Sequence, residues 1–362
     1  SYSVFSYRSS LLEAYQRNYV INKINLVTMT VQFALQIVFL LIFRNYYIYI
    51  ITQFAVQLVN QVAVFLAVKR RFPELRPEGR IEMQMMKQIF TKVKGLFFGR
   101  ISSIILHASD TLVTSMFLGL TSLAIYQNYH FIVWAIVGFI SALLSGSMAG
   151  IGNSLVTETK EKNYRDFRRF TFIMSWIVCV CTNCFLVMFQ PFMRLWMGED
   201  RMLPMGMVVM FCLYFVVTEY NKLFNVYKDA AGLWYEDRFR PLITSLLNLF
   251  LNIAFVKLIG LYGIVGSTVV STLFVGMPWL LHNLFHLLFC RSSLNYLKEL
   301  GRYTVVILVS CAVSFFITCS LNLDGIIGLL VNAVVAVCVP CSLYLILFRR
   351  NEYLHDTLRL LK

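Results

Sequence analysis

Ten segments of the 362-residue chain are long and apolar enough to cross a lipid bilayer. An α-helix rises about 1.5 Å per residue, so roughly 20 apolar residues span a hydrocarbon core of about 30 Å. We therefore predict an all-α, polytopic membrane protein with about ten transmembrane helices. The expected spans are residues 24–43, 46–68, 95–118, 126–156, 170–190, 203–226, 242–258, 262–289, 303–321 and 325–348.

The composition excludes most other classes of protein. Charged residues make up 14% of the chain and hydrophobic residues 59%, whereas about a quarter of the residues in soluble domains are charged. A chain of this composition is neither disordered nor a small disulfide-rich scaffold, and it is not an ordinary soluble enzyme.

Basic residues gather in alternate loops. The chain has 32 Lys and Arg against 18 Asp and Glu, a net charge of +14. Membrane proteins carry their excess Lys and Arg on the cytosolic side, so we expect both ends of the chain to be cytosolic. This topology explains the positive charge, and we expect no nucleic-acid partner. The basic loops are 69–94, 157–169, 227–241 and 290–302, together with both terminal stretches, and the opposite side has only Arg44, Arg194, Arg201 and Lys257.

The cysteines and histidines predict neither a disulfide framework nor a metal site. Cys179, Cys181 and Cys184 share one apolar span, where thiols behave as small apolar groups. His282 and His286 have the i, i+4 spacing of a zinc-binding helix face, but the glutamate of the HExxH motif and an evident third ligand are missing. We expect no metal, no cofactor and no catalytic residue.

Four short segments recur in an order and spacing that point to one family. Each segment alone is a weak match to a family pattern, so the evidence lies in their order and spacing along the chain. They are Leu11–Tyr19 (LLEAYQRNY), Asp110 followed by Leu118-Gly119 and Tyr126, Lys162-Asn163-Tyr164 with Arg168-Arg169, and Tyr227–Leu233 (YKDAAGL) with Arg240-Pro241.

Together these segments resemble the polysaccharide transporters of the multidrug/oligosaccharidyl-lipid/polysaccharide (MOP) superfamily, the flippases for lipid-linked oligosaccharides. The resemblance implies a MATE/MOP-like fold of two six-helix lobes. On that template the first four spans are missing, and we expect the chain to be a fragment of a longer protein. The expected parts are the last two spans of an N-terminal lobe (1–68), a cytosolic linker with an interfacial amphipathic helix or a plain solvated linker (69–94), a complete C-terminal six-helix lobe (95–289), and two additional spans with a cytosolic tail (290–362).

A stripe of polar residues runs along the predicted span 95–118. Arg100, Ser103, His107 and Asp110 lie at offsets of 0, 3, 7 and 10 residues, which places them within about 80° on one helix face. An ionisable group at membrane depth is costly unless it faces water or a bundle interior. We expect Arg100 to meet a diphosphate, and Asp110 and His107 to carry coupling protons or to hold Arg100 in place. The alternative is a polar network that fixes helix packing.

Other polar residues inside the spans allow two interpretations. Asn128 belongs to a Tyr126–His130 cluster that also fits the aromatic belt of the outer interface. Glu219 and Lys222 are three residues apart, a spacing that favours a structural ion pair, and Asn225 lies nearby. The candidate residues of the substrate path are Arg100, Ser103, His107, Asp110, Asn128, Glu219, Lys222 and Asn225.

The resemblance implies a flippase of the bacterial cytoplasmic membrane that works by alternating access. Its partners would be a polyprenyl-diphosphate-linked oligosaccharide, membrane lipids and H⁺ or Na⁺ as the coupling ion. Two alternatives stay open: a cation-coupled multidrug exporter of the same fold, and an integral-membrane glycan polymerase or ligase. We favour a transporter over an enzyme because the outer loops are short and contain four basic residues and no histidine apart from the marginal His130.

Overall fold

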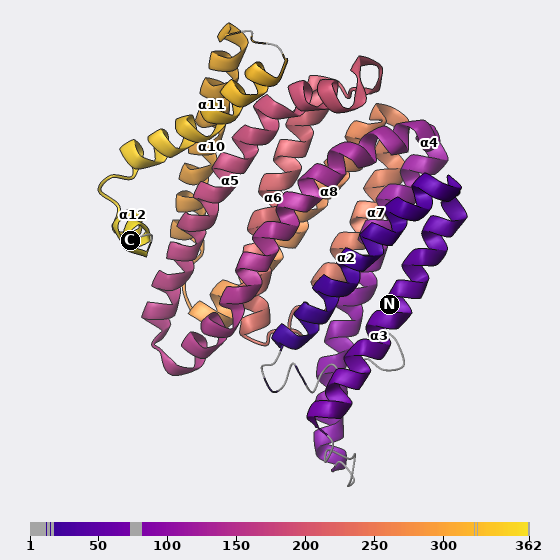
Figure 1. Cartoon of the computed structure of the whole chain (residues 1–362). Coiled ribbons are helices and arrows are strands. Elements are labelled where there is room, and N and C mark those ends of the chain that lie inside the picture. Colours follow the sequence, from indigo (N-terminus) through magenta and orange to yellow (C-terminus); the bar gives the residue numbers. More distant parts are fainter. Residues whose placement is uncertain are drawn as a thin grey trace. The chain divides into compact units, whose positions relative to one another are not determined.

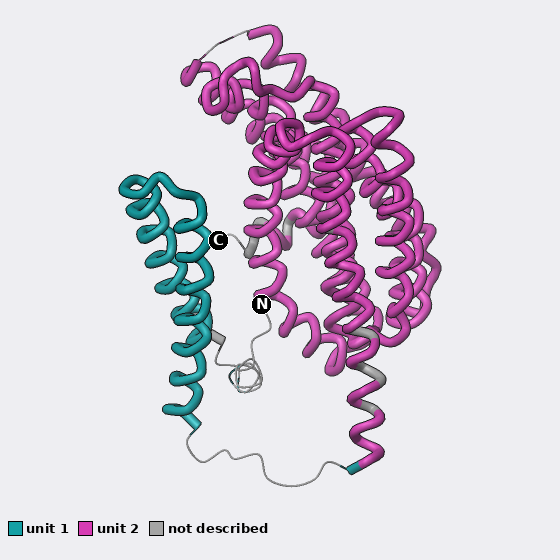
Figure 2. The backbone as a smooth tube through the Cα atoms, turned by 90° about the vertical axis from the view of Figure 1, so that its right-hand side faces the viewer, with its two compact units in different colours: residues 1–82 teal, residues 83–362 magenta. Residues whose placement is uncertain are grey.

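The computed structural model consists of long helices (Figure 1). It describes residues 12, 15, 18–72, 82–321, 323 and 325–360, and no strand occurs in these ranges. Nine helices in this part of the chain are long and apolar enough to cross a membrane. The predicted all-α, multi-pass membrane fold is confirmed. The chain divides into two compact units, residues 1–82 and residues 83–362 (Figure 2).

The first unit is a helical hairpin of α2 (Asn18–Phe43) and α3 (Tyr46–Arg71). Arg44 adopts a left-handed φ of 46° at the turn, and the Asn45 side chain caps α3 by accepting a hydrogen bond from the backbone N–H of Tyr47. Along the hairpin, Asn60 Nδ2 donates to Asn25 Oδ1 at 2.9 Å and to Thr28 Oγ1 at 2.6 Å. These polar bonds fix the pairing of two helices whose other faces are apolar and exposed.

The second unit begins with the longest helix, α4 (Met83–Thr157), which contains two of the predicted spans. Its backbone is non-helical at Gly119, where φ is 82° and ψ is 168°. That conformation is accessible to glycine and strained for other residues. The predicted spans 95–118 and 126–156 therefore lie in two helical segments of α4 that meet at a kink at Gly119. Residues 83–94 belong to the predicted linker, which was expected to contain an amphipathic helix or to be a plain solvated segment, and they are helical and part of α4. Residues 73–81 of the linker lie outside the described ranges.

The span predicted at 262–289 is a single irregular helix. Wider π-type turns at η2 and η3 interrupt its α-helical hydrogen bonding. Pro278 follows the first of them, and its missing backbone N–H removes one bond of the ladder. The elements after α4 are α5 (Lys160–Met197), η1 (Glu199–Arg201), α6 (Met205–Ala230), α7 (Phe239–Ile259), α8 (Leu261–Ser271), η2 (Thr272–Gly276), α9 (Met277–Asn283), η3 (Leu284–Phe289), α10 (Leu294–Leu321), α11 (Gly325–Leu347) and α12 (Glu352–Leu360).

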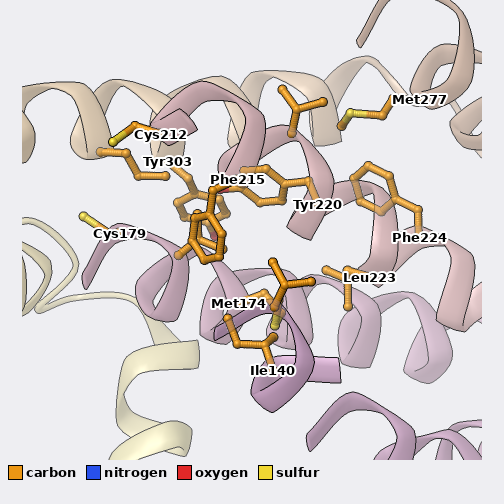
Figure 3. Close-up of a cluster of buried hydrophobic side chains, with 14 of the residues drawn as sticks. Ile140, Met174, Cys179, Cys212, Phe215, Tyr220, Leu223, Phe224, Met277 and Tyr303 are labelled. Atoms are coloured by element: carbon orange, nitrogen blue, oxygen red, sulfur yellow. The ribbon is translucent and has the colours of Figure 1, made fainter. Parts of the chain in front are cut away.

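The core of the second unit lies around α5 and α6 and is rich in aromatic side chains. Phe167 on α5 is fully buried, and its ring lies 4.8 Å from the ring of Tyr227 and 5.0 Å from that of Tyr296. Figure 3 shows side chains from α4, α5, α6, α9 and α10 converging in this cluster, among them Ile140, Phe215 and Tyr303. Aromatic pairs of this kind stabilise a core beyond the area that they bury.

Candidate functional site

A polar network surrounds Asp110 where α4 packs on α7. Asn252 on α7 donates a hydrogen bond from Nδ2 to Asp110 Oδ1 at 2.7 Å. Asn252 is fully buried and Asp110 is half-buried. The Asp110 carboxylate therefore lies at the edge of the helix interface, with one of its oxygens fixed by a buried amide.

The network continues inward to α8. Asn252 Nδ2 also lies 3.2 Å from Asn248 Oδ1, and Asn252 Oδ1 accepts a hydrogen bond from Ser267 Oγ. Asn248 Nδ2 donates in turn to Thr268 Oγ1 at 2.8 Å. We call these five residues, Asp110, Asn248, Asn252, Ser267 and Thr268, the Asp110 network. A buried polar group without a partner costs about 1–3 kcal/mol, and here each amide has one.

A second buried carboxyl group belongs to Glu219 on α6. Glu219 Oε1 lies 3.3 Å from Lys222 Nζ, which confirms the predicted ion pair. The ammonium group of Lys222 also donates to Ser141 Oγ at 2.7 Å and to the Val137 carbonyl at 3.2 Å, both on α4. Glu219 Oε2 is buried and has no hydrogen-bond partner among the described residues. One oxygen of this carboxylate is thus open to a proton or a cation.

Two tyrosines lie near these carboxyl groups. Tyr214 on α6 lies close enough to both Asp110 and Glu219 for their charges to act on its hydroxyl group. Tyr126 on α4 lies close enough to Asp110 for the charge of the carboxylate to act on the Tyr126 hydroxyl group.

A third polar cluster fixes the turn between α6 and α7. Arg240 and Asp237, both buried, form two parallel bonds of 2.7 Å and 2.6 Å. Asn283 on α9 donates to Asp237 at 3.1 Å, and Arg240 donates to Asn225 Oδ1 at 2.9 Å. A bidentate Arg–carboxylate pair with further hydrogen bonds is a strong structural link. Asn225, predicted for the substrate path, is therefore bonded into this structural cluster.

The remaining candidates lie along α4. Arg100 is exposed, Ser103 is half-buried, and the side chain of His107 lies outside the part of the structure that is described. Asn128 is half-buried, one residue before Tyr129, whose hydroxyl group accepts a hydrogen bond from the Leu203 backbone N–H at 3.1 Å. The structure therefore joins Glu219 directly with Lys222. It bonds Asp110 to Asn252, which was not predicted from the sequence, and Asn225 to Arg240 of the fourth family segment.

The asparagines of α7 were not predicted as site residues from the sequence. A signal for them was present, because Ser245, Asn248 and Asn252 recur at offsets of 0, 3 and 7 residues in an apolar span. That spacing places them on one helix face. All three are buried in the structure.

Comparison with protein families gives one match, to the first part of the chain. Residues 1–149 match the family model of polysaccharide biosynthesis proteins. This match is consistent with the resemblance to polysaccharide transporters over residues 1–149, the part that includes Arg100, Ser103, His107, Asp110 and Asn128. Comparisons with curated proteins and with solved structures give no significant match. Family and fold together favour a multi-pass membrane transporter over an enzyme.

Proposed function

We propose that this protein translocates lipid-linked oligosaccharides across the cytoplasmic membrane by alternating access. The family match supports a role in polysaccharide biosynthesis, and the helical membrane fold supports transport. The Asp110 network is the main structural support for this proposal, because it is a connected group of polar side chains within helices that are otherwise apolar.

The chemistry of the cargo explains why such a network is useful. An oligosaccharide head group presents many hydroxyl groups and a diphosphate, and it must cross about 30 Å of hydrocarbon. Polar side chains inside a membrane protein mark substrate and ion pathways, because they are costly to keep where they only face lipid. Asp110 at the rim of the network can accept hydrogen bonds from sugar hydroxyl groups. Arg100, exposed on the same helix, can bind phosphate oxygens through its planar guanidinium group.

Coupling to an ion gradient belongs to the same proposal. Glu219 Oε2 is buried without a partner among the described residues, and Asp110 keeps one oxygen beyond its bond to Asn252. A proton or Na⁺ at either carboxyl group neutralises a charge inside the membrane and changes the stability of the helix packing around it. An elementary charge that crosses the membrane is worth about 2.3 kcal/mol per 100 mV, which is enough to bias two conformations.

A transport assay with the full chain tests the function. The protein is reconstituted in liposomes with a fluorescent polyprenyl-diphosphate-linked oligosaccharide, and a membrane-impermeant quencher measures how much of it reaches the outer leaflet. We expect translocation above that of protein-free liposomes, and acceleration by an ion gradient. Absence of translocation, together with efflux of cationic dyes, would instead favour the drug exporter. Lengthening of the glycan by the purified protein would favour the polymerase.

A further inference from the structure

A basic pocket of about 270 Å³ lies at the end of the second unit where α10 begins. It is lined by Arg168 of α5, by Asn295, Lys298, Glu299 and Arg302 of α10, and by Asn351 in the segment before α12. The four α10 residues recur at offsets of 0, 3, 4 and 7, so they share one helix face. Figure 1 shows α10 and α11 beside α5.

The only carboxylate that lines this pocket is already neutralised. Glu299 Oε2 pairs with Arg168 Nε at 2.7 Å, and Glu299 Oε1 accepts a hydrogen bond from the Tyr303 hydroxyl group at 2.6 Å. Lys298 and Arg302 are exposed, and neither has an ion-pair partner among the described residues. The pocket therefore has two uncompensated positive charges.

The other residues around the pocket supply a hydrogen-bond donor and fix the shape of the pocket. Asn351 Oδ1 accepts a hydrogen bond from the Tyr353 backbone N–H at 2.9 Å, which leaves the Nδ2 group to donate. The Arg168 guanidinium group lies 5.4 Å from the centre of the Tyr353 ring, and Tyr303 and Tyr353 are buried. Arg168, Glu299 and the two tyrosines thus hold the pocket in shape, while Lys298 and Arg302 line it and are exposed to solvent.

We propose that this pocket binds a phosphate group, presented by the head group of an anionic phospholipid. Two cations and an amide donor suit the oxygens of a phosphate monoanion. Basic pockets between helices at the cytosolic surface of membrane proteins bind anionic head groups in this way. Leu294 and Leu297, exposed beside the pocket on α10, offer a surface for acyl chains. This inference is independent of the cargo and of the Asp110 network.

Native mass spectrometry of the full chain in detergent tests the proposal, with phosphatidylglycerol and phosphatidylcholine as probes. We expect saturable binding of phosphatidylglycerol in preference to phosphatidylcholine. Each cation near a membrane surface changes affinity about fivefold, so the K298Q/R302Q variant should bind phosphatidylglycerol about 25-fold more weakly. The R349Q/R350Q variant is the matched control, because it loses the same charge from exposed residues that do not line the pocket.

Three outcomes separate the possibilities. Preferential binding that is lost in K298Q/R302Q and kept in R349Q/R350Q supports the lipid site. Binding of inorganic phosphate with the same dependence, without preference for phosphatidylglycerol, supports the phosphate site and identifies a free anion as its ligand. Equal binding in the pocket variant and the original chain, or an equal loss in both variants, overturns the proposal. If the double variant unfolds, the K298Q variant alone should show a fivefold loss.

Discussion

At the scale of single residues, the site depends on buried amides that link charged groups. Asn252 shows this most clearly, because its one side chain bonds to Asp110, Asn248 and Ser267. The sequence analysis selected Asp110 because a carboxylate in an apolar span is conspicuous. Asn252 was not selected, because an uncharged amide stands out less and two of its three partners, Asp110 and Ser267, come from other helices.

Replacing Asn252 should destabilise the second unit. The Asn252→Ala variant leaves Asp110, Asn248 and Ser267 with fewer partners in a buried place, at a cost of about 1–3 kcal/mol. Thermal unfolding in detergent should show a lower midpoint. The Asn153→Ala variant is the control, because Asn153 is exposed on α4, and its midpoint should hardly change. Equal midpoints for the two variants would contradict the role given to Asn252.

Glu219 and Lys222 should show strong coupling in a double-mutant cycle. Lys222→Met leaves a buried carboxylate without its cation and should cost roughly 2–5 kcal/mol of unfolding free energy. Adding Glu219→Gln removes that unpaired charge, so the double variant should be more stable than Lys222→Met alone. Chemical or thermal unfolding of the four proteins measures this coupling. Additive losses would show that the pair contributes little.

At the scale of elements, the sequence predicted the spans well and their irregularities poorly. Long apolar runs determine where helices cross a membrane, so α2, α3, α5, α6 and α7 overlap the expected spans. The bend in α4 depends on the φ of Gly119, which pattern alone does not reveal. The π-type turns near Pro278 depend likewise on local hydrogen bonding.

The bend at Gly119 should depend on glycine. A Cβ at this position would meet no atom within 4 Å, so Gly119→Ala tests backbone strain alone and should cost about 1–3 kcal/mol. Gly138→Ala is the matched control, because that glycine is helical and its Cβ would also meet no atom within 4 Å. Alanine is the better helix former, so Gly138→Ala should be neutral or stabilising by up to about 1 kcal/mol. Similar unfolding midpoints for the two variants would contradict the strained bend.

At the scale of the whole molecule, the distribution of basic residues predicts the orientation of the chain. With α5 beginning on the cytosolic side, η1 should lie outside. In a cysteine-free background, Glu199→Cys should react with a membrane-impermeant maleimide in intact cells, and Glu158→Cys should react only after the membrane is opened. Glu199 and Glu158 are both exposed, so a difference in labelling between the two cysteine variants reports the side of the membrane and not burial. The reverse pattern would contradict the predicted topology.

In the proposed function, the Asp110 network is part of the transport pathway. The most direct test compares translocation of the lipid-linked oligosaccharide by Asp110→Asn and by Asp200→Asn in liposomes with equal amounts of folded protein. Asp110→Asn keeps the size and the hydrogen-bond acceptor and removes the charge, whereas Asp200 is an exposed carboxylate in η1. Loss of one charged interaction of about 1.5–3 kcal/mol lowers a rate tenfold or more. The account predicts such a fall for Asp110→Asn alone, and equal rates for the two variants would contradict it.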